Sequence, residues 1–493
     1  MTLRPERGRI SLIVNYRDSP SARISFQEWG RQFQRLPDEI IQSYRYFRSE
    51  GIVYPWATYL FPPQTFAIYG SRHLRRLRFD NSLAALRLWG FVLGETERLF
   101  RARQTGKDVI ATMGDLGATP PVVLAGGALP FYPDCTWWLP FMNESPVLFD
   151  AAARSGIGES ACYSRAALGA FVKQAYFPRP VLCIAGTGAS CDDYSSVEQL
   201  VESMGYPMFW LELPLRRDCG ERGESNCERF ATTPAGTSYQ VSARELISAQ
   251  FRALQRRLEA VLNRPIADAQ LQASIRKVNR VRGLVNRIKG IAYAPPAAVF
   301  PALELMLIEF GNLHFYSDID EWTAILEHVA ETVLERSRRQ QYLGPVDALR
   351  VVWVTPPADP LLLSYAEDLG LRIVGTEYVI AQALPEIPET GDPLANLAET
   401  FLNASLIGSS RARAQSVIAQ AQRYQAEGVI ISGILGGSHC AAETNLIRDY
   451  VQEALDLPVL AFDVPAPSGL IQSQIKTRIE AFVEVLRTNR GKW

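Results

Sequence analysis

The chain has 493 residues, 47% hydrophobic and 21% charged, a length and composition that suggest two or three globular domains. Its 51 basic and 52 acidic residues give a formal net charge of −1, which does not predict a nucleic-acid partner or binding to an anionic membrane surface. No run of about 20 apolar residues suggests a membrane span, and the first residues lack the apolar core of a signal peptide. We therefore expect a cytoplasmic location and no membrane association.

Seven cysteines in a large chain without a secretion signal favour reduced thiols, metal ligands or catalytic sulfurs over a disulfide framework. The four histidines form no recognisable zinc motif such as HExxH. Cys219 and Cys227 lie among charged residues at no standard metal spacing, and we interpret them as incidental.

Residues 1–104 predict a mostly helical N-terminal extension. Residues 10–14 have the pattern of a strand, whereas residues 26–46 and 82–103 have helical periodicity, the second with an apolar face. The basic cluster at 72–78 is most simply a solvated face. An anion site for the phosphates of a cofactor is the alternative interpretation.

The pattern changes near residue 105, where strands and helices begin to alternate. Residues 109–113 predict a buried strand, residues 120–126 a short helix, and a second strand ends just before Cys135. After a further helix over 145–155, Cys162 lies at the start of another helix. Ser160 or Glu159 could act as the cap of that helix.

Two later segments repeat this pattern. Residues 180–214 predict a strand, a Gly/Ser loop, a helix that follows Cys191, and another strand. Residues 350–380 predict a further strand–loop–helix–strand unit that contains no cysteine. Residues 216–240 are polar and aperiodic, so we expect a loop or lid there.

Residues 428–465 carry the clearest motif, a strand, a glycine-rich loop, a helix and a strand. The β-branched residues 429–431 predict the first strand, and Gly433, Gly436 and Gly437 would let the backbone turn sharply. Cys440 follows at the start of a helix expected over 441–455. The unpaired N–H groups of a helix N-terminus stabilise a thiolate, although a small buried residue is the alternative interpretation of this cysteine.

Such alternation predicts parallel strands whose carboxyl ends carry the ligand-binding loops. We expect an α/β fold with two doubly wound, Rossmann- or flavodoxin-like parallel-sheet domains. The expected division is a mostly helical N-terminal extension at 1–104, a first α/β domain at 105–245, a helical connector at 246–344 and a second α/β domain at 345–493.

Several motifs, in the same order, resemble the 2-hydroxyacyl-CoA dehydratase and benzoyl-CoA reductase family, over residues 106–487. They are PPVVLAGGALPFYPD, CYSRAALGAF, SCDDYSSVEQLVESMGYPMFWLELP, LQASIRKVNRVRGLVNRI, EGVIISGILGGSHC and SQIKTRIEAFVEVL. The last two are the most specific. The chain departs from the family in lacking an acidic residue near the start of the helix at 120–126, in the insertion at 216–240 and in its long N-terminal region.

The resemblance implies a [4Fe–4S] cluster held by three cysteines, two from the first α/β domain and one from the second. Cys162 and Cys440 match the family's ligands well, and Cys135 is the best match for the third. Thiolates are the usual ligands of iron–sulfur clusters, and three ligands leave one iron position open. Cys191 is the main rival, because its place in residues 180–214 matches that of Cys440, but the family's corresponding position is not normally a ligand.

By the same resemblance, we expect a cluster-carrying subunit of a radical acyl-CoA enzyme. The favoured reaction is ATP-activated dehydration of a 2-hydroxyacyl-CoA to an enoyl-CoA through a ketyl radical. The implied partners are a homologous second subunit, or a second copy of the chain, and a separate ATP-hydrolysing iron–sulfur activator. The chain itself contains no GxxxxGK[ST] phosphate loop.

Two other classes of function stay open. One is reduction, either of an aromatic acyl-CoA of the benzoyl-CoA type or by a low-potential double-cubane-like reductase. The other is a noncatalytic partner subunit. The acyl group is not identified, and neither are the roles of Cys183, Cys191, Cys219 and Cys227.

The resemblance also implies that the corner before the C-terminal helix contributes to the active cleft. Ser468 and Gln472 are therefore candidate substrate-contacting residues. Arg478 is more simply a structural ion-pair residue than a ligand of a CoA phosphate. His439, beside Cys440, could donate a hydrogen bond to cluster or substrate, with a solvent-facing loop residue as the alternative.

Overall fold

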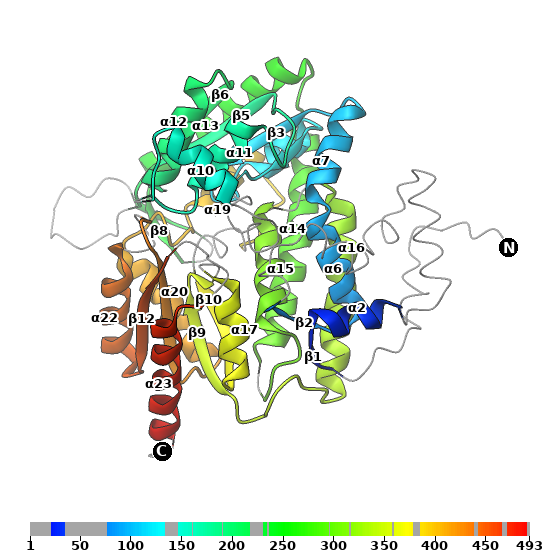
Figure 1. Cartoon of the computed structure of the whole chain (residues 1–493). Coiled ribbons are helices and arrows are strands. Elements are labelled where there is room, and N and C mark those ends of the chain that lie inside the picture. Colours follow the sequence, from blue (N-terminus) through cyan, green and yellow to red (C-terminus); the bar gives the residue numbers. More distant parts are fainter. Residues whose placement is uncertain are drawn as a thin grey trace.

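The computed structural model describes residues 21–34, 76–133, 146–159, 161–189, 191–216, 230–233, 236–294, 296–314, 317–356, 359–377, 385–437, 442–465 and 471–490. Two four-stranded parallel sheets lie at opposite ends of the molecule, and long helices run between and beside them (Figure 1). This arrangement confirms the predicted α/β fold with two parallel-sheet units. The exact division at residues 104, 245 and 344 stays a prediction.

The first sheet has the spatial order β4 (Leu129–Phe131), β3 (Val109–Met113), β5 (Leu182–Gly188) and β6 (Met208–Leu213). All three pairings are parallel. Every residue of β3 is buried, as expected for an inner strand of a parallel sheet. The helices of this unit are α8 (Pro120–Ala125), α10 (Pro146–Arg154), α11 (Arg165–Lys173) and α12 (Asp192–Ser203).

The second sheet has the order β10 (Leu371–Glu377), β9 (Leu349–Val354), β11 (Gly428–Ile434) and β12 (Val459–Val464), again with parallel pairings. Its helices are α17 (Pro360–Asp368), α20 (Ser410–Arg423), α22 (Thr444–Leu455) and α23 (Ser473–Arg490). In both sheets the second strand in the chain lies outside the first, and the third and fourth follow on the other side. Each sheet therefore has a topological switch point between its first and third strands, where ligands of such folds bind.

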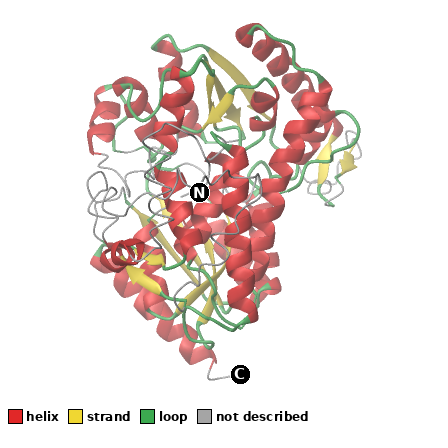
Figure 2. Ribbon diagram, turned by 90° about the vertical axis from the view of Figure 1, so that its right-hand side faces the viewer, coloured by secondary structure: helices red, strands yellow, loops and turns green. Residues whose placement is uncertain are grey.

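Long helices form the body between the sheets (Figure 2). They are α6 (Leu83–Leu93), α7 (Glu95–Gln104), α13 (Val241–Leu262), α14 (Asp268–Ala292), α15 (Ala302–His314), α16 (Ile319–Arg338) and α19 (Pro393–Phe401). Helix α14 packs against α16 on one side and α8 on another. None of the helices that the structure describes is long and apolar enough to cross a membrane.

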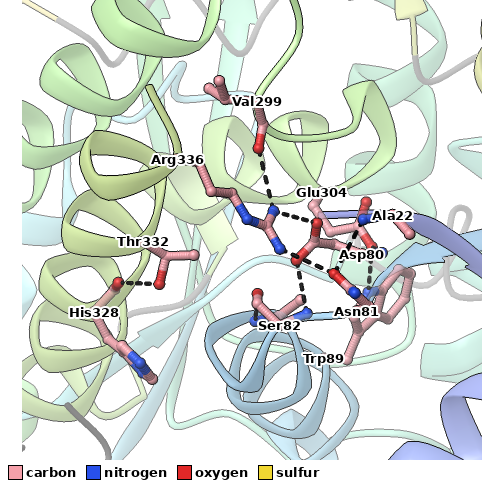
Figure 3. Close-up of polar contacts among 11 residues, drawn as sticks. Ala22, Asp80, Asn81, Ser82, Trp89, Val299, Glu304, His328, Thr332 and Arg336 are labelled. Carbon is pink, nitrogen blue, oxygen red and sulfur yellow. Dashed lines mark hydrogen bonds and ion pairs between the residues drawn. The ribbon is translucent and has the colours of Figure 1, made fainter. Parts of the chain in front are cut away.

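A buried polar cluster fastens the N-terminal segment to this body (Figure 3). The segment contains α2 (Phe26–Gln34) and an antiparallel ribbon of β1 (Arg23–Ser25) and β2 (Arg78–Asp80). Arg336 of α16 pairs with Asp80 at 2.5 Å and donates to Asn81 Oδ1 at 3.0 Å. Glu304 of α15 accepts hydrogen bonds from the Asp80 backbone N–H and from the Trp89 indole.

Several element boundaries differ from the predictions. The helix expected over 82–103 is two helices, α6 and α7, which meet at Gly94, where the low helix propensity of glycine favours a break. The Ser82 side chain caps α6. Helix α11 begins at Arg165 with Ser164 as N-cap, so Ser160 and Glu159 were the wrong choice of cap.

The second sheet and the predicted lid show further differences. Helix α22 begins at Thr444, three residues after the predicted start. Gly433 lies within β11 and pairs with Asp463 rather than turning the chain. Part of the expected aperiodic lid forms a small antiparallel ribbon of β7 (Phe230–Thr232) and β8 (Ser238–Gln240).

Candidate functional site

The two α/β units meet at the carbonyl oxygen of Val464, at the end of β12. The phenolic O–H of Tyr163, in the turn before α11, donates to this oxygen at 2.6 Å. The backbone N–H of Leu435, directly after β11, donates to the same oxygen at 3.0 Å. The loop that contains Cys162 therefore lies against the point where the chain leaves β11 toward Cys440.

A second contact joins the same edges of the units. The Arg216 guanidinium, beyond the end of β6, donates to the carbonyl oxygens of Leu402 and Ala404, both at 2.7 Å. Its backbone N–H donates to the Ile407 carbonyl oxygen at 2.7 Å. Because β6 and β12 both approach the interface with their carboxyl ends, the edges that bind ligands in such folds face each other.

Helix α14 adds a third link. Arg282 of α14 donates to the Gly117 carbonyl oxygen, in the loop after β3, at 3.2 Å, and to the Pro385 carbonyl oxygen at 2.7 Å. Asn279, one turn earlier, donates to the Ile387 carbonyl oxygen at 2.7 Å and accepts from the Ile387 N–H at 2.8 Å. This helix thus holds the loop after β3 and the segment at 385–387 in register.

Cys162 lies within this contact zone and is 7% exposed. Burial raises the pKa of its thiol, and the nearby Asp193 carboxylate raises it further. A hydrogen bond from the Ser164 backbone N–H acts in the opposite direction. Without a bound metal the side chain is therefore a neutral thiol, and its deprotonation would accompany metal binding.

A buried carboxyl group marks the switch point of the first sheet. Asp115, in the loop after β3, accepts hydrogen bonds from the Thr119 N–H at 2.8 Å, the Thr119 hydroxyl at 2.5 Å and the Tyr132 hydroxyl at 2.6 Å. Burial raises the pKa of Asp115. Because Tyr132 follows β4 and precedes Cys135 by three residues, Asp115 anchors the start of the segment that leads to that cysteine.

The family comparison agrees with these geometric features. The model of the family "2-hydroxyglutaryl-CoA dehydratase, D-component" matches residues 119–486, about three quarters of the chain. The chain belongs to this family. It is also similar to a benzoyl-CoA reductase subunit from Thauera aromatica, with 25% identity over 239 residues. That match covers 46% of this chain and 59% of the relative, so the chain spans about three fifths of the relative's length. Both findings confirm the predicted resemblance.

Among the residues predicted for the site, Cys162 and Gln472 are described. Gln472 is exposed just before α23, and its carbonyl oxygen accepts the Lys476 N–H at 3.1 Å. Cys135, Cys440, His439 and Ser468 lie outside the described residues. Arg478 donates to the Ala461 carbonyl oxygen of β12 at 2.6 Å, so it ties α23 to the sheet through a backbone group rather than through the expected ion pair.

The other described cysteines differ in environment. Cys183 is fully buried in β5, and burial raises the pKa of its thiol to about 12. Cys191 is the half-buried N-cap of α12, the same helix whose first turn contains Asp193. Cys162, Cys183 and Cys191 are all free thiols. Within the described part of the chain, no three potential ligands are grouped closely enough to hold a metal.

Cys162 has the features that a cluster ligand of this family requires. It is a soft sulfur donor, it is buried away from solvent, and a backbone N–H points at it, as is typical of iron–sulfur sites. The sequence analysis missed two supporting residues, Tyr163 and Asp115. Asp115 carried a local signal, since it is a carboxylate directly after a predicted strand, but the partner of Tyr163 is 301 residues away in sequence.

Proposed function

We propose that the chain is the cluster-carrying subunit of a radical acyl-CoA enzyme, with Cys135, Cys162 and Cys440 as ligands of one [4Fe–4S] cluster between the two α/β units. The main support is the shared Val464 carbonyl oxygen. It brings the Cys162 segment to the loop that leads to Cys440. Membership of the dehydratase family provides independent support.

When bound, such a cluster supplies single electrons and an iron with an open position. The chain's own residues hold and shield the site. Tyr163 fixes the two units at the distance that the shared ligand set needs, and burial of Cys162 excludes water from its sulfur. Asp115 holds Tyr132, and with it the segment that leads to Cys135.

Dehydration of a 2-hydroxyacyl-CoA to an enoyl-CoA is the reaction we favour, because the family is named for such a dehydratase. The reaction removes a hydroxyl group and a β-hydrogen as water and leaves no net change in electron count. One electron therefore acts as a catalyst and is recovered at the end of each turnover. A separate ATP-hydrolysing iron–sulfur activator would supply it, and a homologous subunit or a second copy of the chain would complete the enzyme.

Reduction of an aromatic acyl-CoA is the second candidate, supported by the similarity to the benzoyl-CoA reductase of Thauera aromatica. This reaction consumes two electrons for each ring reduced, so it needs a stoichiometric donor. The two candidates therefore differ in an easily measured quantity.

The test uses anaerobically purified protein, with its co-purifying subunit if there is one. We expect about four iron and four sulfide ions per chain, as for a single [4Fe–4S] cluster. About twice these amounts would indicate a double-cubane reductase, and their absence would indicate a noncatalytic partner subunit. With an activator and a panel of acyl-CoA thioesters, dehydration predicts many product molecules for each electron supplied. A fixed ratio of two electrons per product would support reduction instead.

A further inference from the structure

Arg413 of α20 lies between two carboxylates that belong to different parts of the second unit. Its side chain is 1% exposed. It binds both oxygens of Glu377, at the end of β10, with N–O distances of 3.1 and 2.8 Å. Its third nitrogen, Nη1, donates to Glu443 at 2.5 Å. A planar guanidinium is suited to this two-sided arrangement.

Glu443 is the residue through which Arg413 reaches the candidate site. It is the N-cap of α22 and lies three residues after Cys440 in the chain. Its other carboxylate oxygen accepts a hydrogen bond from the Ser410 hydroxyl, also on α20, at 3.1 Å. The first turn of α20 thus holds the start of α22 by two contacts.

The segment 435–443, which includes Cys440, is therefore fixed at both ends. At its start, the Leu435 N–H binds the Val464 carbonyl oxygen, and the turn closes with the Gly437 N–H on the Ile434 carbonyl oxygen at 2.8 Å. Gly436 has a φ of +83° there, a conformation that favours glycine. At its end, Arg413 and Ser410 hold Glu443.

Fold stability alone does not account well for Arg413. Burying an ion pair costs desolvation energy, and apolar residues of similar volume often stabilise a core as well or better. Burial lowers the pKa of Arg413, but the carboxylates of Glu377 and Glu443 outweigh this effect and raise it, so the guanidinium stays charged at every relevant pH. A permanent cation that grips an inner carboxylate and a helix start is suited to fixing geometry.

We propose that Arg413 is a positioning residue for Cys440: through Glu443 it fixes the end of the segment that presents this cysteine to the cluster. The inference rests on the proposed function for its purpose. The positioning itself is a property of the cluster-free chain and can be measured separately.

The first experiment is hydrogen–deuterium exchange on cluster-free protein, comparing the wild type with R413Q, E443Q and the double variant. We expect R413Q and E443Q each to raise exchange at 435–447 by about tenfold, which corresponds to ~1.4 kcal/mol. The double variant should exchange no faster than R413Q, because both substitutions remove the same contact. R423Q is the matched control, since Arg423 is an exposed residue at the end of the same helix.

Two exchange results would overturn the inference. One is unchanged exchange at 435–447 in both single variants. The other is an equal rise across all four strands of the second sheet, which would mean that Arg413 only supports the fold. If R413Q does not fold, E443Q decides the matter, because Glu443 is partly exposed at a helix end.

The second experiment measures the reduction potential and the electron paramagnetic resonance spectrum of the iron-loaded protein. We expect R413Q to change both, R413K to restore them in part through a single-point contact, and R423Q to match the wild type. Wild-type spectrum and potential in R413Q would overturn the inference. A wild-type protein that binds no iron would instead refute the proposed function, and the exchange data would still decide whether Arg413 positions the segment.

Discussion

Tyr163 donates its hydroxyl to the carbonyl oxygen of Val464 at 2.6 Å, although 301 positions separate the two residues in the chain. The same oxygen accepts the Leu435 N–H at 3.0 Å, so it is shared between the two α/β units. If the cluster lies between the units, this hydrogen bond sets the geometry of its ligands. Its removal should therefore affect the cluster more than it affects the fold.

The substitution Tyr163→Phe tests this expectation. It removes one hydrogen bond donor, which should lower the free energy of unfolding by about 1 kcal/mol. We also expect a loss of at least half of the bound iron after exposure to a mild chelator, measured by colorimetric assay. Tyr206→Phe is the matched control, because its hydroxyl binds the Phe171 carbonyl oxygen within the first unit. Equal iron loss in the two variants would contradict the role of Tyr163.

Asp115→Asn tests the anchor of the segment before Cys135. The asparagine keeps the size of the side chain but replaces one of its two acceptor oxygens with a donor, although Asp115 accepts from both Thr119 and Tyr132. We expect a loss of about 1–3 kcal/mol in the free energy of unfolding, because a buried polar group is left without its partner. Iron content should fall as well. Asp108→Asn, at a partly exposed ion pair before β3, should change neither quantity by much.

The buried cluster of Figure 3 predicts a pH dependence of stability. Burial and the neighbouring Asp80 carboxylate raise the pKa of Glu304 from 4.5 to about 8. Between these values the folded chain keeps a proton on Glu304 that the unfolded chain has lost. The contribution of this group is therefore complete below pH 4.5 and is lost as the pH rises toward 8.

Glu304→Gln should remove this dependence, because glutamine resembles the protonated acid. Chemical denaturation of both proteins at pH 5, 6, 7 and 8 measures the difference. The stability of the wild type relative to the variant should fall by on the order of 1 kcal/mol per pH unit over this interval. A constant difference between the two proteins would show that Glu304 is ionised in the folded state.

Local sequence patterns predicted the elements that depend on local signals. The strand at 109–113 has the predicted bounds, and Ile475, Ile479 and Leu486 of α23 are all buried at the predicted helical spacing. These patterns arise from burial of one face, which each residue reports through its own polarity. The family motifs added Cys162 as a candidate ligand.

The contacts that organise the site could not be predicted in this way. Arg413 is buried because Glu377 and Glu443, 36 and 30 residues away, converge on it, yet an arginine in a polar helix suggests a solvated face. Helix α20 was not predicted at all, since its sequence has few large apolar residues. Tyr163 likewise depends on a partner in the other α/β unit. Such contacts are a product of topology, which the local pattern does not encode.

The most direct test of the central claim is iron and sulfide analysis of single cysteine-to-serine variants, purified and reconstituted under anaerobic conditions. We predict that Cys135→Ser, Cys162→Ser and Cys440→Ser each lose the cluster spectrum and most of the iron, while Cys191→Ser keeps both. Circular dichroism and thermal melting would confirm that each variant is folded. Full iron in folded Cys162→Ser, or loss of the cluster in folded Cys191→Ser, would contradict the proposed ligand set.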